Sequence, residues 1–143
     1  MEKKLRLTLT LSTAGTIFVL FPVLAPIGFS IINLFSNGKF LLDFLMPAEL
    51  GLLVMIGGGL LIWAALRSKS HLKWIAWSFG FAILLVVVSQ ALAGITGLAS
   101  GSIDPSGWPY IIVLGGIIGY DIAVILLGIG GVLLCQTLLR TKK

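Results

Sequence analysis

Four long apolar stretches dominate this sequence and limit the folds that it can adopt. They cover about residues 5–34, 48–66, 72–98 and 110–139. About 20 apolar residues in a helix cross a hydrocarbon core near 30 Å thick, because each residue advances the helix by about 1.5 Å. Hydrophobic residues make up 58% of the chain and charged residues only 10%, whereas soluble domains carry about 25% charged residues. The sequence therefore predicts an integral membrane protein.

The sequence pattern favours helices over strands. A membrane β-barrel needs segments of roughly 10 residues in which apolar and polar residues alternate. The only alternating run, residues 5–11, continues into unbroken apolar sequence. We therefore predict an all-α fold, a bundle of four transmembrane helices in one domain that covers residues 1–143. The fourth stretch is longer than one crossing requires, so residues 110–120 are compatible with a spanning helix, a kinked helix or an apolar outer cap.

The basic residues indicate the orientation, because Lys and Arg concentrate in short cytoplasmic loops. Nine of the ten positive residues fall on one side of the predicted bundle, in three clusters. The clusters are Lys3, Lys4 and Arg6; Arg67, Lys69 and Lys73; and Arg140, Lys142 and Lys143. Only Lys39 falls on the other side. Both termini are therefore predicted to be cytoplasmic, in a multi-pass protein of the cell membrane.

A similarity within the chain suggests a duplication. Residues 53–69, LVMIGGGLLIWAALRSK, match residues 126–142, LLGIGGVLLCQTLLRTK, at nine of 17 positions. A duplication would give two helical hairpins of like orientation, related by an axis along the membrane normal. Convergent composition is the alternative, because segments rich in Leu and Gly match one another readily.

Polar side chains within the apolar stretches are the candidate functional residues, because an ionisable group inside hydrocarbon is costly. Asp121, Gln90 and Glu49 lie 19, 17 and 18 residues from a basic residue at the cytoplasmic end of their own stretch. At about 1.5 Å per residue, this counting puts them at one height, about 26–28 Å from the cytoplasmic boundary. We predict that they bind a proton, a cation or a small polar solute. The alternatives for Asp121 are a structural hydrogen bond to Gln90 or Tyr120 and simple placement at the membrane interface, and the alternative for Glu49 is a helix-dipole role.

Glycines mark predicted contacts between helices, because small residues let helices in lipid approach closely. Two groups stand out, one formed by Gly57, Gly58 and Gly59 and the other including Gly115 and Gly119. The first group is interpreted as a close crossing or as a hinge that lines a transport site. The second group lies on the side of its helix opposite Asp121. Two opposed packing faces on one helix suggest a homo-oligomer, most simply a two-fold dimer.

The chain offers no set of residues for an enzyme site. Intramembrane catalysis needs a nucleophile with a base, paired carboxylates or a metal cluster, and the chain has one His, His71, and one Cys, Cys135. We interpret Cys135 as a packing residue and expect no enzyme activity, cofactor, metal or nucleic acid. Two functions remain. One is a small oligomeric transporter or channel, which Asp121, the glycine run and the repeat favour, and the other is an accessory or scaffolding subunit that packs on a larger membrane protein.

Overall fold

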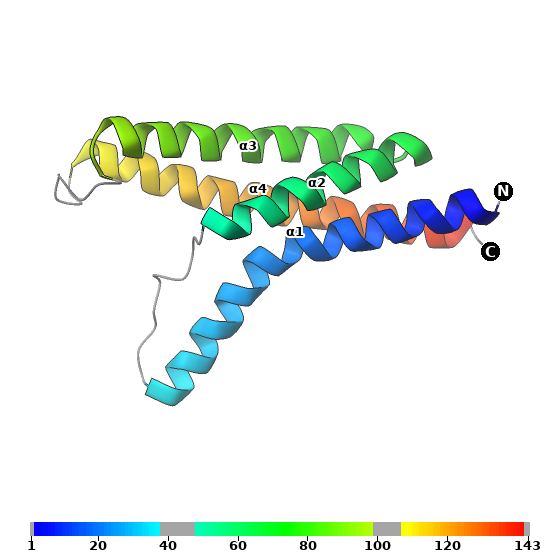
Figure 1. Ribbon diagram of the computed structural model, residues 1–143, viewed down its shortest axis with the longest axis horizontal. Helices are drawn as coiled ribbons and strands as arrows, with labels where there is room; N and C mark the ends of the chain where they lie inside the picture. Colours follow the sequence, from blue (N-terminus) through cyan, green and yellow to red (C-terminus); the bar gives the residue numbers. More distant parts are fainter. Residues whose placement is uncertain (1, 38–47, 99–106, 142–143) are drawn as a thin grey trace.

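The computed structural model describes residues 2–37, 48–98 and 107–141. This part of the chain forms four helices, α1 (Glu2–Asn37), α2 (Ala48–Ser68), α3 (Leu72–Ile95) and α4 (Trp108–Thr141) (Figure 1). It contains no strand, so the predicted all-α fold with four helices is confirmed. Each helix includes a segment long and apolar enough to cross a membrane. The segments are Lys3–Ala25, Gly51–Ser68, Leu72–Ile95 and Trp108–Arg140.

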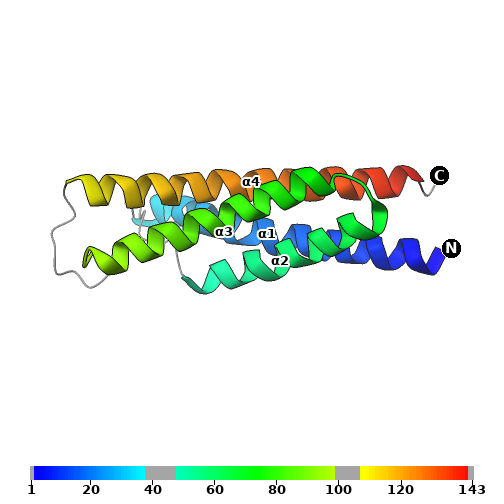
Figure 2. The same ribbon diagram turned by 90° about the horizontal axis from the view of Figure 1, so that it is seen from above.

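The helix bounds follow the apolar stretches closely. α2 and α3 begin at the predicted residues, Ala48 and Leu72. α3 ends three residues early, at Ile95, because Gly97 adopts a φ of 77° and a left-handed residue just beyond the last turn stops a helix. α4 is one unbroken helix from Trp108 to Thr141 (Figure 2). Residues 110–120 are therefore part of a long helix.

The four helices form two hairpins that pack side by side. α1 packs along α2 as extensively as α3 packs along α4, and α1 also packs along α4. The contacts of α2 with α3 and with α4 are smaller. Both termini and the turn between α2 and α3 lie at one end of the bundle (Figures 1 and 2). We call this the basic end, because Lys3, Lys69 and Arg140 lie there, and its position in the cytoplasm stays a prediction.

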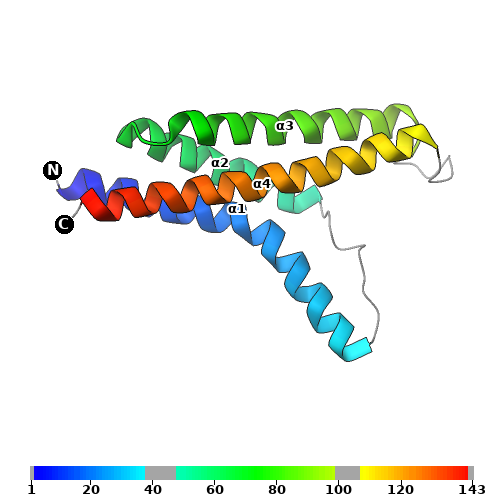
Figure 3. The same ribbon diagram turned by 180° about the vertical axis from the view of Figure 1, so that it is seen from behind.

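α1 is bent near its middle, and its second half diverges from the other three helices (Figures 1 and 3). Pro22 and Pro26 lie in the helix. A proline has no N–H to donate to the carbonyl four residues earlier, and its ring pushes against that carbonyl, so prolines bend helices. The diverging half exposes large apolar side chains, among them Ile32 and Phe35, of which Phe35 is 86% exposed.

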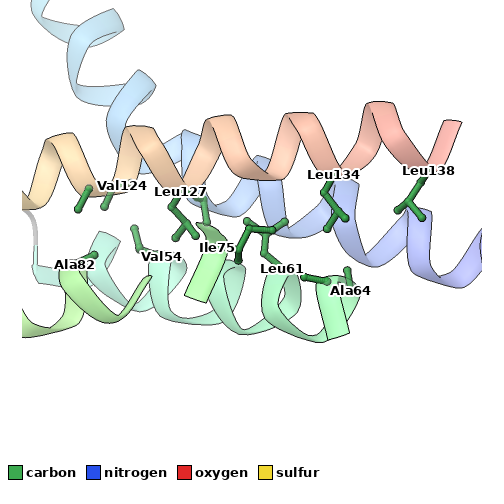
Figure 4. Packing of buried hydrophobic residues seen from close by; sticks show 12 residues of the cluster. Val54, Leu61, Ala64, Ile75, Ala82, Val124, Leu127, Leu134 and Leu138 are labelled. Carbon is green, nitrogen blue, oxygen red and sulfur yellow. The ribbon is translucent and has the colours of Figure 1, made fainter. Parts of the chain in front are cut away.

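The core of the bundle is apolar and lies between the helices. Figure 4 shows Val124, Leu127, Leu134 and Leu138 along α4, with Val54, Leu61 and Ala64 of α2 opposite them. The outside is apolar as well, and Trp77 and Ile95 are 79% and 84% exposed. Soluble monomers rarely expose contiguous apolar patches of more than a few hundred square ångströms. The distribution of side chains is therefore compatible with a bundle that has lipid around it.

Candidate functional site

Asp121 lies on the side of α4 that turns toward α1. Gly128, seven residues later, faces Leu20 of α1, and residues seven apart share one side of a helix. α1 and α4 run in opposite directions, so Asp121 is level with the part of α1 beyond Pro22, where α1 diverges from the bundle (Figure 3). The Asp121 side chain is half-buried. It has no hydrogen-bond or ion-pair partner within the described part of the chain.

Gln90 is not brought together with Asp121. Gln90 is exposed on α3, and the neighbouring Ser89 is the residue that faces α4, against Gly116. Asp121 lies five residues closer to the basic end than Gly116, roughly 7 Å along the helix axis. It is also rotated by roughly 200° from Gly119, which faces α3. The two polar side chains therefore differ in both height and direction.

The common height expected for these residues does not hold, because the basic residues from which it was counted are not level with one another. Ile75 of α3 faces Gly130 of α4. In this register Lys73 is level with about residue 132 of α4. Arg140 therefore lies about eight residues, or roughly 12 Å along the helix axis, beyond the level of Lys73 in the direction of the basic end. The shift moves Asp121 away from the level of Gln90.

Glu49 and the other acidic side chains do not add to a cluster in the described part of the chain. Glu49 belongs to the first turn of α2, where an acid complements the helix dipole, but its side chain lies outside the described residues. Within residues 2–37, 48–98 and 107–141, no group of three or more His, Cys, Asp or Glu side chains gathers that could hold a metal ion. Of the two acidic candidates, Asp121 is thus the one whose side-chain surroundings the structure describes.

The glycine run in α2 lies where two other helices come close. A Cβ built on Gly57 would be 2.8 Å from the carbonyl oxygen of Gly15 on α1, and one built on Gly58 would overlap the ring of Phe79 on α3. Gly59 faces open space. α2 stays helical through all three residues. Two of the glycines thus act as contact points in an unbroken helix, which matches the close crossing rather than the hinge.

Both packed faces of α4 are occupied within one chain. On the face toward α3, Gly116 contacts Ser89 and Gly119 contacts Leu85. On the face toward α1, Gly128 contacts Leu20 and Gly131 contacts Thr16. Gly115 faces open space. The two faces that suggested a second copy are therefore both used by neighbouring helices of the same chain. The homo-oligomer, and the dimer in particular, stay predictions without this support.

Tyr120 lines a separate apolar crevice of about 210 Å³ between α2, α3 and α4. The other lining side chains are aliphatic or aromatic, among them Val54, Met55 and Phe79. Asp121 follows Tyr120 but is rotated by about 100° around the helix, and it does not line the crevice. No hydrogen bond joins Asp121 to Tyr120, since neither side chain forms one among the described residues.

A polar seam between α1 and α4 was not found by sequence reasoning. Thr8, Ser12 and Thr16 are buried on α1, and the Ser12 hydroxyl lies 3.0 Å from the Cys135 sulfur of α4. Thr16 donates to the Ser12 carbonyl at 2.8 Å, so its hydroxyl is satisfied within its own helix. The spacing of four residues between the three hydroxyls puts them on one helix face. That spacing is the signal that would have revealed the seam.

Comparison of the chain with protein-family models, with curated proteins and with solved structures finds no match. Three features of the described residues bear on the function of the chain. They are the half-buried carboxylate of Asp121, the two helical hairpins, and the diverging half of α1.

Proposed function

We propose that this chain is a small transporter or channel for a proton, a cation or a small polar solute, and that Asp121 binds the transported species. The observation behind the proposal is the half-buried Asp121 side chain, which forms no hydrogen bond or ion pair among the described residues. It lies 13 residues after Trp108 and 19 before Arg140, well inside the candidate span of α4. An ionisable group at such a depth is expensive to keep and therefore usually serves a function.

The position of Asp121 beside the bend of α1 supports this role. The two prolines of α1 leave the carbonyls of Phe18 and Pro22 without their usual N–H donors. In the register set by Gly128 and Leu20, the Pro22 carbonyl lies about five residues, or roughly 7 Å, from the level of Asp121 on the side of the basic end. Freed carbonyls and a carboxylate are the ligand types that transport sites in membranes use for protons and cations. The proposal relies on Asp121 for binding and leaves Gln90 out, because Gln90 lies on another helix at another height.

A relation between the two hairpins supports the inference of an internal repeat. At an offset of 73 residues, Gly57 and Gly58 of α2 correspond to Gly130 and Gly131 of α4. Gly57 faces α1 and Gly130 faces α3, in each case the first helix of the same hairpin. Gly58 faces α3 and Gly131 faces α1, in each case the first helix of the other hairpin, and Gly131 also lies against Leu61 of α2. Corresponding glycines thus make corresponding contacts, as in transporters that are built from two parallel repeats.

Flux through reconstituted vesicles tests the proposal. The wild-type protein should carry protons, sodium or potassium down an imposed gradient faster than empty vesicles do. Asp121→Asn keeps the size of the side chain and removes its charge, so we expect flux to fall at least tenfold while the melting temperature in detergent stays within a few degrees. Gln90→Ala is the matched control and should leave flux unchanged. Equal flux in the wild type and in Asp121→Asn would rule out the role of Asp121.

The second candidate is an accessory subunit, and the diverging half of α1 favours it. Ile31, Ile32 and Phe35 are 47%, 62% and 86% exposed there, and a helix that leaves its own bundle offers its sides to other helices. Under this function no gradient drives flux above that of empty vesicles. A photo-crosslinking residue at Ile32 then captures one larger membrane protein, whereas the same residue at the exposed Trp77 of α3 captures none.

A further inference from the structure

A groove at the basic end lies beside the turn between α2 and α3. It has a volume of about 770 Å³ and is lined by Leu66, Lys69, His71, Leu72, Lys73 and Trp74. Half of this lining is apolar or aromatic, and half carries amine or imidazole groups. Such a mixture suits a ligand that is itself apolar along one part and charged at the other.

Two hydrogen bonds to α4 hold the walls of the groove in place. The Trp74 indole N–H donates to the Leu126 carbonyl at 3.2 Å, and the His71 Nε2 lies 3.2 Å from the Thr137 hydroxyl. Lys69 and His71 both have left-handed backbones, with φ of 54° and 55°, which lets the chain reverse within three residues. The shape of the groove is thus fixed by the fold, because the turn and the indole ring both form hydrogen bonds with α4.

The lysines of the groove lie in a long stretch of sequence without acidic residues. The sequence contains no Asp or Glu between Glu49 and Asp104. Lys69 and Lys73 are exposed, and neither forms an ion pair within the described part of the chain. Two positive charges that form no ion pair among the described residues, beside a tryptophan and at the end of an apolar bundle, form the pattern that attracts anionic lipid to the surface of a membrane.

We propose that this groove binds an anionic phospholipid. The phosphate headgroup lies between Lys69 and Lys73, and the first part of one acyl chain lies along Leu66 and Trp74. Lysine stems pack along apolar surface while their ammonium groups reach the headgroup level, so both parts of the lipid find matching groups. Each lysine near an anionic membrane surface increases binding by about fivefold.

Quenching of Trp74 fluorescence by brominated lipids measures the proposed binding. Replacement of the other three tryptophans by phenylalanine, at Trp63, Trp77 and Trp108, leaves Trp74 as the single reporter. In phosphatidylcholine vesicles, brominated phosphatidylglycerol should quench Trp74 at least fivefold more effectively than brominated phosphatidylcholine at the same fraction. The double variant Lys69→Gln, Lys73→Gln should reduce this preference at least fivefold.

A matched control separates the groove from the general positive charge of the basic end. The double variant Lys3→Gln, Lys4→Gln removes the same charge from the start of α1, away from the groove, and should keep the preference within twofold. Lys73→Gln alone should give an intermediate loss of the preference for phosphatidylglycerol. It provides a second measurement if the double variant unfolds at a much lower temperature than the wild type. An equal loss in the Lys3 and Lys4 variant, or equal quenching by both lipids in the wild type, would overturn the proposal. Relief of quenching by soluble glycerol phosphate would show a site for small phosphates instead.

Discussion

Gly57→Ala should destabilise the bundle by about 1–3 kcal/mol, the usual result of adding a methyl group to a closely packed site. The added Cβ would be 2.8 Å from the Gly15 carbonyl oxygen and 2.8 Å from the Cβ of Phe18. Both atoms belong to the backbone of α1 or are bonded directly to it, so they cannot rotate away, and α1 and α2 have to separate. Unfolding in detergent, followed by circular dichroism, measures the difference in free energy.

Gly59→Ala is the matched control for this prediction. It lies two residues away in the same helix, and a Cβ built there meets nothing within 4 Å. Alanine is a better helix former than glycine by about 1 kcal/mol, so stability should stay the same or increase. Equal destabilisation by the two changes would mean that the run acts through the flexibility of α2. In that case the crossing of α1 and α2 would not explain the glycines.

Leu61→Ala should destabilise the bundle by about 2–3 kcal/mol, the lower part of the range for buried leucines. Leu61 is fully buried, and its side chain fills the space between Gly15 of α1 and Gly131 of α4. Its removal leaves a cavity where three helices meet, and the lost packing contacts weaken all of them. The lower part of the range applies because an unfolded helix in lipid keeps its leucines in apolar surroundings.

Leu52→Ala provides the comparison for Leu61→Ala on the same helix. Leu52 is 67% exposed, so its side chain contributes little to the packing between helices. We expect a change within about 0.5 kcal/mol, as for other positions away from packed contacts. A loss at Leu52 as large as that at Leu61 would contradict the position assigned to the core between α1, α2 and α4.

The existence and the starts of the helices could be predicted from the sequence. The length of a span is set by the thickness of the hydrocarbon core, and the breaks at residues 69–71 and 99–107 are rich in Ser, Gly, Lys and Pro. A close approach of helices at the glycine run was one of the two interpretations that residue size allowed. These features depend on local sequence, so no knowledge of the neighbouring helices was needed.

The surroundings of the candidate site depended on how the helices are shifted and rotated against one another. Counting along each helix from its basic residue assumed that Lys73 and Arg140 are level, and the contact between Ile75 and Gly130 shows that they are not. The bend of α1 removed its second half from α4 beside Asp121. Neither the shift nor the bend angle can be predicted from the hydrophobic pattern of a single helix, because both result from packing between helices.

The four helices are proposed to cross a membrane with the basic end on the cytoplasmic side. Labelling of single cysteines in intact cells by a membrane-impermeant maleimide tests it most directly. In a Cys135→Ala background, Ser106→Cys should react from outside the cell, and Ser70→Cys should react only after the membrane is opened. Labelling of Ser70→Cys from outside, with Ser106→Cys protected, would contradict the predicted orientation, and labelling of both in intact cells would contradict the four crossings.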